Sequence, residues 1–166
     1  MENERFILAV YVENKAGVLT RITAMFTRRG FNIDALTVAE TETKEYSRIT
    51  VEMRGDEYVR SQLITQLQKL VVVKKVEVLE TQSMQRELML IKVKNQSENR
   101  SDIMTAVDVF RASVIDYSVE SMCIEVTGAP SKIDAFIKLM QPFGILEMCR
   151  TGVVALDRGN TTLLNK

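Results

Sequence analysis

One order of apolar patterns occurs twice along the chain, and this repetition limits the possible folds more than any other feature. In residues 5–79 the patterns follow the order strand, helix, strand, strand, helix, strand. The same order returns in residues 87–148. Identical letters also recur, since Ile33-Asp34 matches Ile115-Asp116 at an offset of 82 positions. We therefore predict two tandem copies of one βαββαβ unit.

Strands and helices of the repeat differ in their periodicity. Residues 5–12 are nearly all apolar, which is typical of a central strand buried on both faces. From Val18 the apolar residues follow the spacing of an amphipathic helix, and Gly30 can end it in the left-handed conformation. The tail from Asp157 is polar and is expected to fray. The predicted strands cover residues 5–12, 31–39, 46–53, 71–79, 87–93, 114–119, 122–127 and 145–148.

The βαββαβ order determines the topology of each unit. Right-handed crossovers give the strand order 4-1-3-2, with both helices on one face of the sheet. The predicted fold class is therefore α+β, with two tandem ferredoxin-like units and antiparallel sheets. A unit of about 80 residues buries only ~60–65% of its unfolded surface, and its sheet leaves one face and its edges uncovered. Docking of two sheets, within one chain or between chains, would cover them, so we predict a homodimer or a larger oligomer.

Charge and composition disfavour several classes of protein. The chain has 22 Lys+Arg and 22 Asp+Glu, so it lacks the basic excess of a nucleic-acid binder. Without His it has no Ser-His-Asp triad and no His-ligated metal. Cys123 and Cys149 fall on predicted strands two spacings apart, ~9.5 Å, which is too far for a disulfide. We expect no catalytic residue, no metal and no cofactor on this chain, and a cytoplasmic protein without membrane contact.

The connection between the first strand and the first helix is the best candidate for a binding site. Its residues are Asn14-Lys15-Ala16-Gly17-Val18-Leu19. Free N–H groups and the positive end of the helix dipole favour a carboxylate there, and Gly17 allows close approach of a ligand. Asn14 can both donate and accept hydrogen bonds, as an α-amino acid requires. A plain strand–helix connection is the alternative. Nearby Glu40, Glu42 and Glu45 are interpreted as a solvated hairpin.

Two segments carry a resemblance to a known family. They are Val12-Glu13-Asn14-Lys15-Ala16-Gly17-Val18-Leu19 and Phe26-Thr27-Arg28-Arg29-Gly30-Phe31-Asn32-Ile33-Asp34-Ala35-Leu36-Thr37-Val38, and both resemble the small regulatory subunit of acetohydroxyacid synthase (acetolactate synthase). The resemblance implies an ACT domain, an amino-acid-sensing module, in residues 1–82. It also implies the family's C-terminal ferredoxin-like domain in residues 83–166, where Thr151-Gly152-Val153-Val154-Ala155-Leu156 matches.

The resemblance further implies a function. ACT domains of this family pair side by side and bind a branched-chain amino acid, usually valine, at the pairing interface. The site residues carried over are Asn14, Lys15, Ala16, Gly17, Val18 and Leu19, with Asn32 and Ile33 contributed from the partner chain. The chain would then activate a large catalytic subunit and confer feedback inhibition on it. Thiamine diphosphate, Mg²⁺ and FAD are expected on that subunit.

Three other functions are compatible with parts of this pattern. A free-standing ACT sensor could control transcription or another enzyme, although all four predicted helices belong to the two units. RNA-binding proteins share the topology, but the third strand, residues 46–53, has one aromatic residue at its edge. An enzyme on this scaffold would need a cluster of ionisable residues, and none stands out. The equivalent loop of the second half, residues 95–100, lacks the glycine, and we predict no amino-acid site there.

Overall fold

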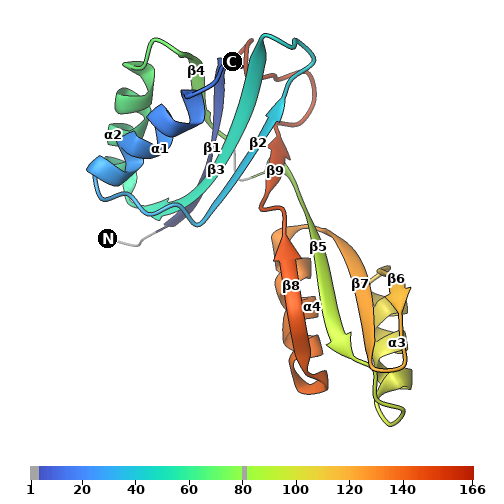
Figure 1. Ribbon diagram of the computed structural model, residues 1–166. Coiled ribbons are helices and arrows are strands. Elements are labelled where there is room, and N and C mark those ends of the chain that lie inside the picture. The colour runs from blue at the N-terminus through green and yellow to red at the C-terminus, as the bar shows by residue number, and fades with distance from the viewer. Residues whose placement is uncertain (1–3, 80–81) are drawn as a thin grey trace. The chain divides into compact units, whose positions relative to one another are not determined.

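The structure is a computed structural model that describes residues 4–79 and 82–166, and it contains two compact units (Figure 1). The strands are β1 (Glu4–Glu13), β2 (Ala35–Glu40), β3 (Tyr46–Gly55), β4 (Val73–Val78), β5 (Met84–Lys94), β6 (Ser113–Tyr117), β7 (Ser121–Gly128), β8 (Ile145–Arg150) and β9 (Val154–Leu156). The helices are α1 (Val18–Arg28), α2 (Glu57–Gln68), α3 (Arg100–Val109) and α4 (Pro130–Met140), followed by the 3₁₀ turn η1 (Gln141–Phe143).

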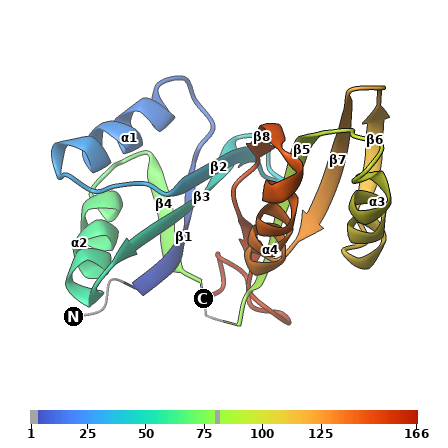
Figure 2. The same ribbon diagram turned by 90° about the horizontal axis from the view of Figure 1, so that it is seen from below.

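Both units have the predicted topology. The first sheet has the strand order β2-β3-β1-β4, and the second contains the path β6-β7-β5-β8. Each order is the predicted 4-1-3-2 order read from its other edge, and the strand pairs are antiparallel. Within each unit both helices pack on one face of the sheet (Figure 2). The α+β class and the duplicated ferredoxin-like fold are therefore confirmed.

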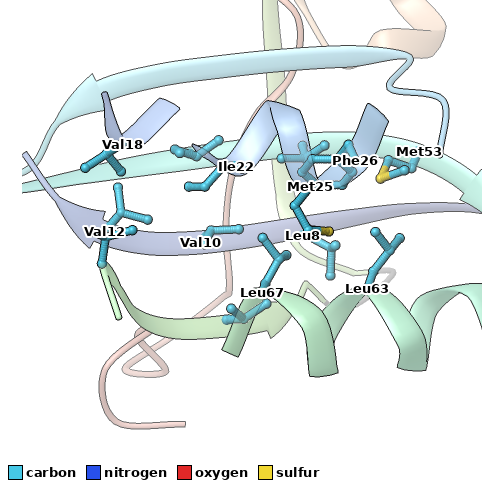
Figure 3. Packing of buried hydrophobic residues seen from close by; sticks show 14 of the residues in the cluster. Leu8, Val10, Val12, Val18, Ile22, Met25, Phe26, Met53, Leu63 and Leu67 are labelled. Carbon is cyan, nitrogen blue, oxygen red and sulfur yellow. The ribbon is translucent and has the colours of Figure 1, made fainter. Parts of the chain in front are cut away.

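Strand β1 is central because it pairs with β3 on one side and β4 on the other, and both of its faces are covered. Its alternate residues Leu8, Val10 and Val12 point toward the helices and are almost completely buried. Figure 3 shows Ile22 and Phe26 of α1 and Leu63 and Leu67 of α2 closing over them. This cluster is the core of the first unit, and it holds the N-terminal end of α1 next to the end of β1.

The opposite face of β1 is covered by the C-terminal tail. Ile7, Ala9 and Tyr11 form a second buried cluster with Val153, Ala155 and Leu163. Arg48 Nη2 donates to the Ala155 carbonyl at 2.8 Å, and Lys75 Nζ donates to the Lys166 backbone oxygen at 2.7 Å. Burial lowers the pKa of the Arg48 guanidinium from its usual value.

The expectation of a frayed tail is therefore wrong. Leu163 of this tail, together with Val153 and Ala155 just before it, fills the face that the helices leave open. Residues 153–166 belong to the first compact unit, whereas the predicted division at residues 82 and 83 places them in the second half. A segment of the same chain thus covers this sheet face, whereas the prediction above was the docking of a second sheet.

Replacing Leu163 by alanine should destabilise the first unit by about 2 kcal/mol, the low end for a buried leucine. Leu163 is 7% exposed and contacts the sheet, whereas its neighbour Leu164 is 58% exposed. Leu164→Ala is thus a matched control that should leave stability unchanged. Urea unfolding of the full chain measures both effects, and equal midpoints for the two variants would contradict the role of the tail.

Strand β2 begins later than predicted. The N–H of Phe31 donates to the carbonyl of Phe26 and the N–H of Gly30 donates to that of Thr27, which together cap α1. Gly30 adopts the predicted left-handed conformation, with φ of 69°. The chain then stays irregular until Ala35, because Phe31 and Ile33 turn into the core before pairing with β3 begins.

Candidate functional site

Residues 14–17 join the end of β1 to the first turn of α1. Gly17 is the N-cap of α1, with φ of 83° and ψ of −7°, a left-handed conformation that favours glycine. Val18 is buried beneath the loop, whereas Leu19 is 40% exposed beside it. Among the described residues, none accepts a hydrogen bond from the N–H groups of Ala16, Gly17 or Leu19. Exposed donors at the positive end of a helix suit a carboxylate.

The side chain of Asn14 joins the loop to the hairpin between β2 and β3. Asn14 Nδ2 donates to Glu40 Oε1 at 3.0 Å and to the Lys44 carbonyl at 2.9 Å, and its backbone N–H donates to the Glu45 carbonyl at 2.7 Å. Both amide hydrogens of the side chain are therefore used within the chain. Asn14 can offer a ligand its Oδ1 oxygen, which is an acceptor suited to an ammonium group.

Glu40 is the residue of this site that the sequence interpretation missed. It is the last residue of β2 and is exposed, and its carboxylate lies against the amide of Asn14. A carboxylate and an amide oxygen next to each other make a stronger acceptor site for an ammonium group than either alone. The local sequence shows only an acid near a polar turn, so this role depends on the tertiary contact across the hairpin.

Glu13 anchors the base of the loop through two ion pairs. Lys74 Nζ of β4 lies 2.7 Å from Glu13 Oε1, and Lys15 Nζ lies 3.0 Å from Glu13 Oε2. The hydrogen bond from Lys74, followed by that from Lys15, lowers the pKa of Glu13 from 4.5 to about 2. Lys15 thus points back to β1, and its ammonium is engaged within the chain.

Titration of the Glu13 carboxyl carbon by NMR should show a midpoint near pH 2. The lowered pKa means that this ion pair stabilises the folded chain fully above pH 4.5, and that the contribution is lost as the pH falls toward 2. Replacing Lys74 by methionine should move the midpoint back toward 4.5, since Lys74 is the main cause of the shift. Lys15→Met should move it less, and the reverse ranking would contradict this assignment.

Asn32 and Ile33 lie at the opposite end of α1 from the loop, before β2 and not at its start. The 11 residues of α1 span about 16 Å, so one chain does not bring these residues to residues 14–19. Asn32 is exposed and donates from Nδ2 to Asp34 Oδ1 at 3.2 Å, whereas Ile33 is half-buried against the core. The two groups can form one site only with a second chain, as the resemblance requires.

The equivalent loop of the second unit is closed by its own side chains. Asn95, the counterpart of Asn14, is 5% exposed. Its Nδ2 donates to the Ser118 carbonyl at 2.6 Å, and its Oδ1 accepts from Arg100 Nε at 3.0 Å. Both polar atoms of this buried amide are therefore engaged within the chain, in contrast to Oδ1 of Asn14.

The remaining candidate groups are dispersed. Strand β5 lies between Cys123 on β7 and Cys149 on β8, and both thiols are free, as the predicted strand order implied. In residues 4–79 and 82–166 no three His, Cys, Asp or Glu residues gather as metal ligands would. Over the same residues, each helix is too short or too polar to cross a membrane.

Comparison with known proteins connects this geometry to a family. The family model for the small subunit of acetolactate synthase matches residues 86–159, and that for the small-subunit-like ACT domain matches residues 8–75. A probable acetolactate synthase small subunit of Archaeoglobus fulgidus is 48% identical over 92% of this chain and 96% of its own length. The acetolactate synthase small subunit of Bacillus subtilis is 46% identical over 92% of this chain and 90% of its own length.

A solved structure agrees with these sequence matches. The acetolactate synthase small subunit of Thermotoga maritima has a TM-score of 0.88 and 39% identity, covering 95% of this chain and 99% of that one. This chain thus matches acetolactate synthase small subunits in both sequence and fold, over nearly the whole length of each. The chain belongs to the acetolactate synthase small-subunit family, and its first unit contains the ACT domain of that family.

Proposed function

We propose that this chain is a regulatory subunit that binds valine, or another branched-chain amino acid, and so controls the catalytic subunit of acetolactate synthase. The family implies a catalytic large-subunit partner. On this proposal the chain activates that partner and confers end-product inhibition on it. Thiamine diphosphate, Mg²⁺ and FAD would be held by the partner, and both chains would work in the cytoplasm.

The observation that carries the proposal is the arrangement around Gly17. Unpaired N–H groups at the start of α1 suit the carboxylate of an amino acid. Asn14 Oδ1 and the carboxylate of Glu40 suit its ammonium group. Donors for a carboxylate and acceptors for an ammonium group therefore lie at the two ends of one short loop, as a zwitterion requires. Leu19 offers an exposed apolar surface for the side chain of the amino acid.

A second copy of the chain would complete the site. Strand β2 is an edge of the first sheet, and Val38 on it is 42% exposed. If two β2 strands pair antiparallel about a two-fold axis, the end of one strand lies beside the start of the other. Glu40 ends β2 next to Asn14, so the residues brought there are Asn32 and Ile33 of the partner subunit.

Calorimetry of the free chain with valine, leucine and isoleucine tests the binding site. We expect saturable binding of at least one of them, with differences of only ~1–3 kcal/mol between them, because one methylene changes little in an apolar pocket. Glu40→Gln should weaken binding about 10- to 100-fold through loss of a charged hydrogen bond. Glu42→Gln, on the same hairpin, is the matched control and should bind as the unmodified chain does.

Mixing the chain with the catalytic subunit tests the regulatory role. We expect a complex whose activity exceeds that of the catalytic subunit alone and falls when the bound amino acid is added. A chain that binds the amino acid but neither joins nor affects the catalytic subunit would instead support the free-standing sensor. Absence of amino-acid binding by the folded chain would contradict both functions.

A further inference from the structure

A basic hollow of about 700 Å³ lies between α1 and α2, on the helix face of the first unit. Three cations surround it, Arg28 and Arg29 at the end of α1 and Lys69 at the end of α2. The described residues that line it include no carboxylate. The hollow is therefore a concentrated positive surface on a chain whose net charge is zero.

The three cations differ from other basic residues of the same unit in their contacts. Arg5, Arg54 and Lys74 each form an ion pair with a carboxylate. In the described part of the chain, no carboxylate lies within ion-pair distance of Arg28, Arg29 or Lys69. Arg29 Nη2 donates to Gln66 Oε1 at 2.9 Å and Arg28 Nε to the Ala24 carbonyl at 3.3 Å, and both acceptors are uncharged. The guanidinium charges thus remain available to an outside anion.

The apolar part of the hollow favours a protein segment over a small anion. Met25, Phe31 and Leu70 form part of its lining, and Tyr58 at its rim is 71% exposed. Arginine and tyrosine around an apolar floor are typical of protein interfaces. The N-terminus of α2 is not open to a phosphate group, because Asp56 caps it and its side chain accepts from the Val59 N–H at 2.9 Å.

The hollow also shares structure with the candidate amino-acid site. Helix α1 begins at Gly17 and ends at the arginines, about 16 Å away. Phe31, which lines the hollow, directly precedes Asn32 and Ile33. A ligand that shifts α1, or the segment after it, therefore changes the hollow as well. Such a shared element is what coupling between two sites requires.

We propose that this basic hollow is the docking surface for an acidic segment of the catalytic subunit, with an apolar residue of that segment seated on its floor. The inference rests on the proposed regulatory function and names the surface through which it acts. Because the contact is electrostatic, the affinity between the subunits falls as salt is added.

The test uses the full chain with Arg28→Glu, Arg29→Glu and Lys69→Glu combined, titrated against the purified catalytic subunit. We expect the Kd to rise about 100-fold at low salt, because attraction becomes repulsion at three positions. The three glutamine replacements should give a smaller loss and a weaker salt dependence. A control with Arg86→Glu, Lys94→Glu and Lys138→Glu changes the net charge equally in the second unit and should bind normally.

Calorimetry of the free variant with valine separates this inference from the proposed function. We expect the glutamate variant to bind valine as the unmodified chain does, which also shows that it folds. A variant that still binds the catalytic subunit normally would overturn the docking surface alone. Failure of the unmodified chain to bind that subunit would overturn both. Tripolyphosphate serves as the probe for a small anion. If the glutamate variant loses tripolyphosphate binding but keeps its affinity for the catalytic subunit, the hollow is a small-anion site and the inference is overturned.

Discussion

Replacing Gly17 by aspartate should abolish the response to valine, with an apparent Kd raised about 100-fold or more. The left-handed backbone at this position strains any other residue by about 1–2 kcal/mol. A carboxylate there would also occupy the positive helix end, which stabilises a bound anion by up to ~2 kcal/mol. Apart from its chain neighbours, no atom of the described residues lies within 4 Å of the position a Cβ would take, so the added group enters open space beside the unpaired N–H groups.

Calorimetry of the free chain and inhibition curves of the assembled enzyme measure this effect. Gly159→Asp is the matched control, since Gly159 has a φ of 68° and equally open surroundings in the tail. It introduces the same strain and charge away from the loop and should leave valine binding unchanged. A Gly17→Asp chain that remains sensitive to valine would remove the loop from the site.

Replacing Arg150 by methionine should destabilise the second unit by about 3 kcal/mol, because it leaves a buried carboxylate unpaired. Arg150 Nε and Nη2 lie 2.6 and 2.9 Å from the two carboxylate oxygens of Glu87, whose side chain is only 4% exposed. The hydrogen bond with Glu87 raises the pKa of Arg150. The pair joins the end of β8 to β5, so its loss should loosen the centre of the second sheet.

Hydrogen exchange of the β5 and β7 amides at increasing urea concentration measures this loss. Asp134→Asn is the control, since Asp134 also contacts Arg150, at 3.1 Å, but its side chain is 56% exposed, and the cost should stay below about 1 kcal/mol. Adding Glu87→Leu to Arg150→Met should restore most of the stability, because no buried charge then remains. Equal effects of the Arg150 and Asp134 variants would contradict the buried pair as the cause.

Local periodicity was sufficient to predict the four helices, eight of the nine described strands and their order. The apolar run at residues 5–12 predicted a central strand, and β1 is central. Gly30 predicted the end of α1, and its left-handed conformation is part of that cap. The start of β2 was predicted too early, because Phe31 and Ile33 are apolar for packing on the core and not for pairing in a strand.

The candidate site was only partly readable in the same way. The loop with Gly17 follows from its place between a strand and a helix, and the structure gives it the expected open helix end. The roles of Asn14 and Glu40 do not follow from their place in the sequence. The side-chain amide of Asn14 donates to Glu40, which lies 26 positions further along the chain. Neither the loop sequence nor the hairpin sequence predicts that contact.

The sequence by itself determined the fold class, the strand order and the family of this protein, because side-chain period and short connections act locally and leave few topologies open. Only the tertiary structure decided what covers the second face of β1. Val153 and Ala155 lie in the apolar run Val153-Val154-Ala155-Leu156, and Leu163 lies beside the exposed Leu164, so the letters alone do not show which of these residues are buried. Val153, Ala155 and Leu163 are buried because the face around Ile7 and Tyr11 has no helix and must exclude water, which depends on distant segments meeting.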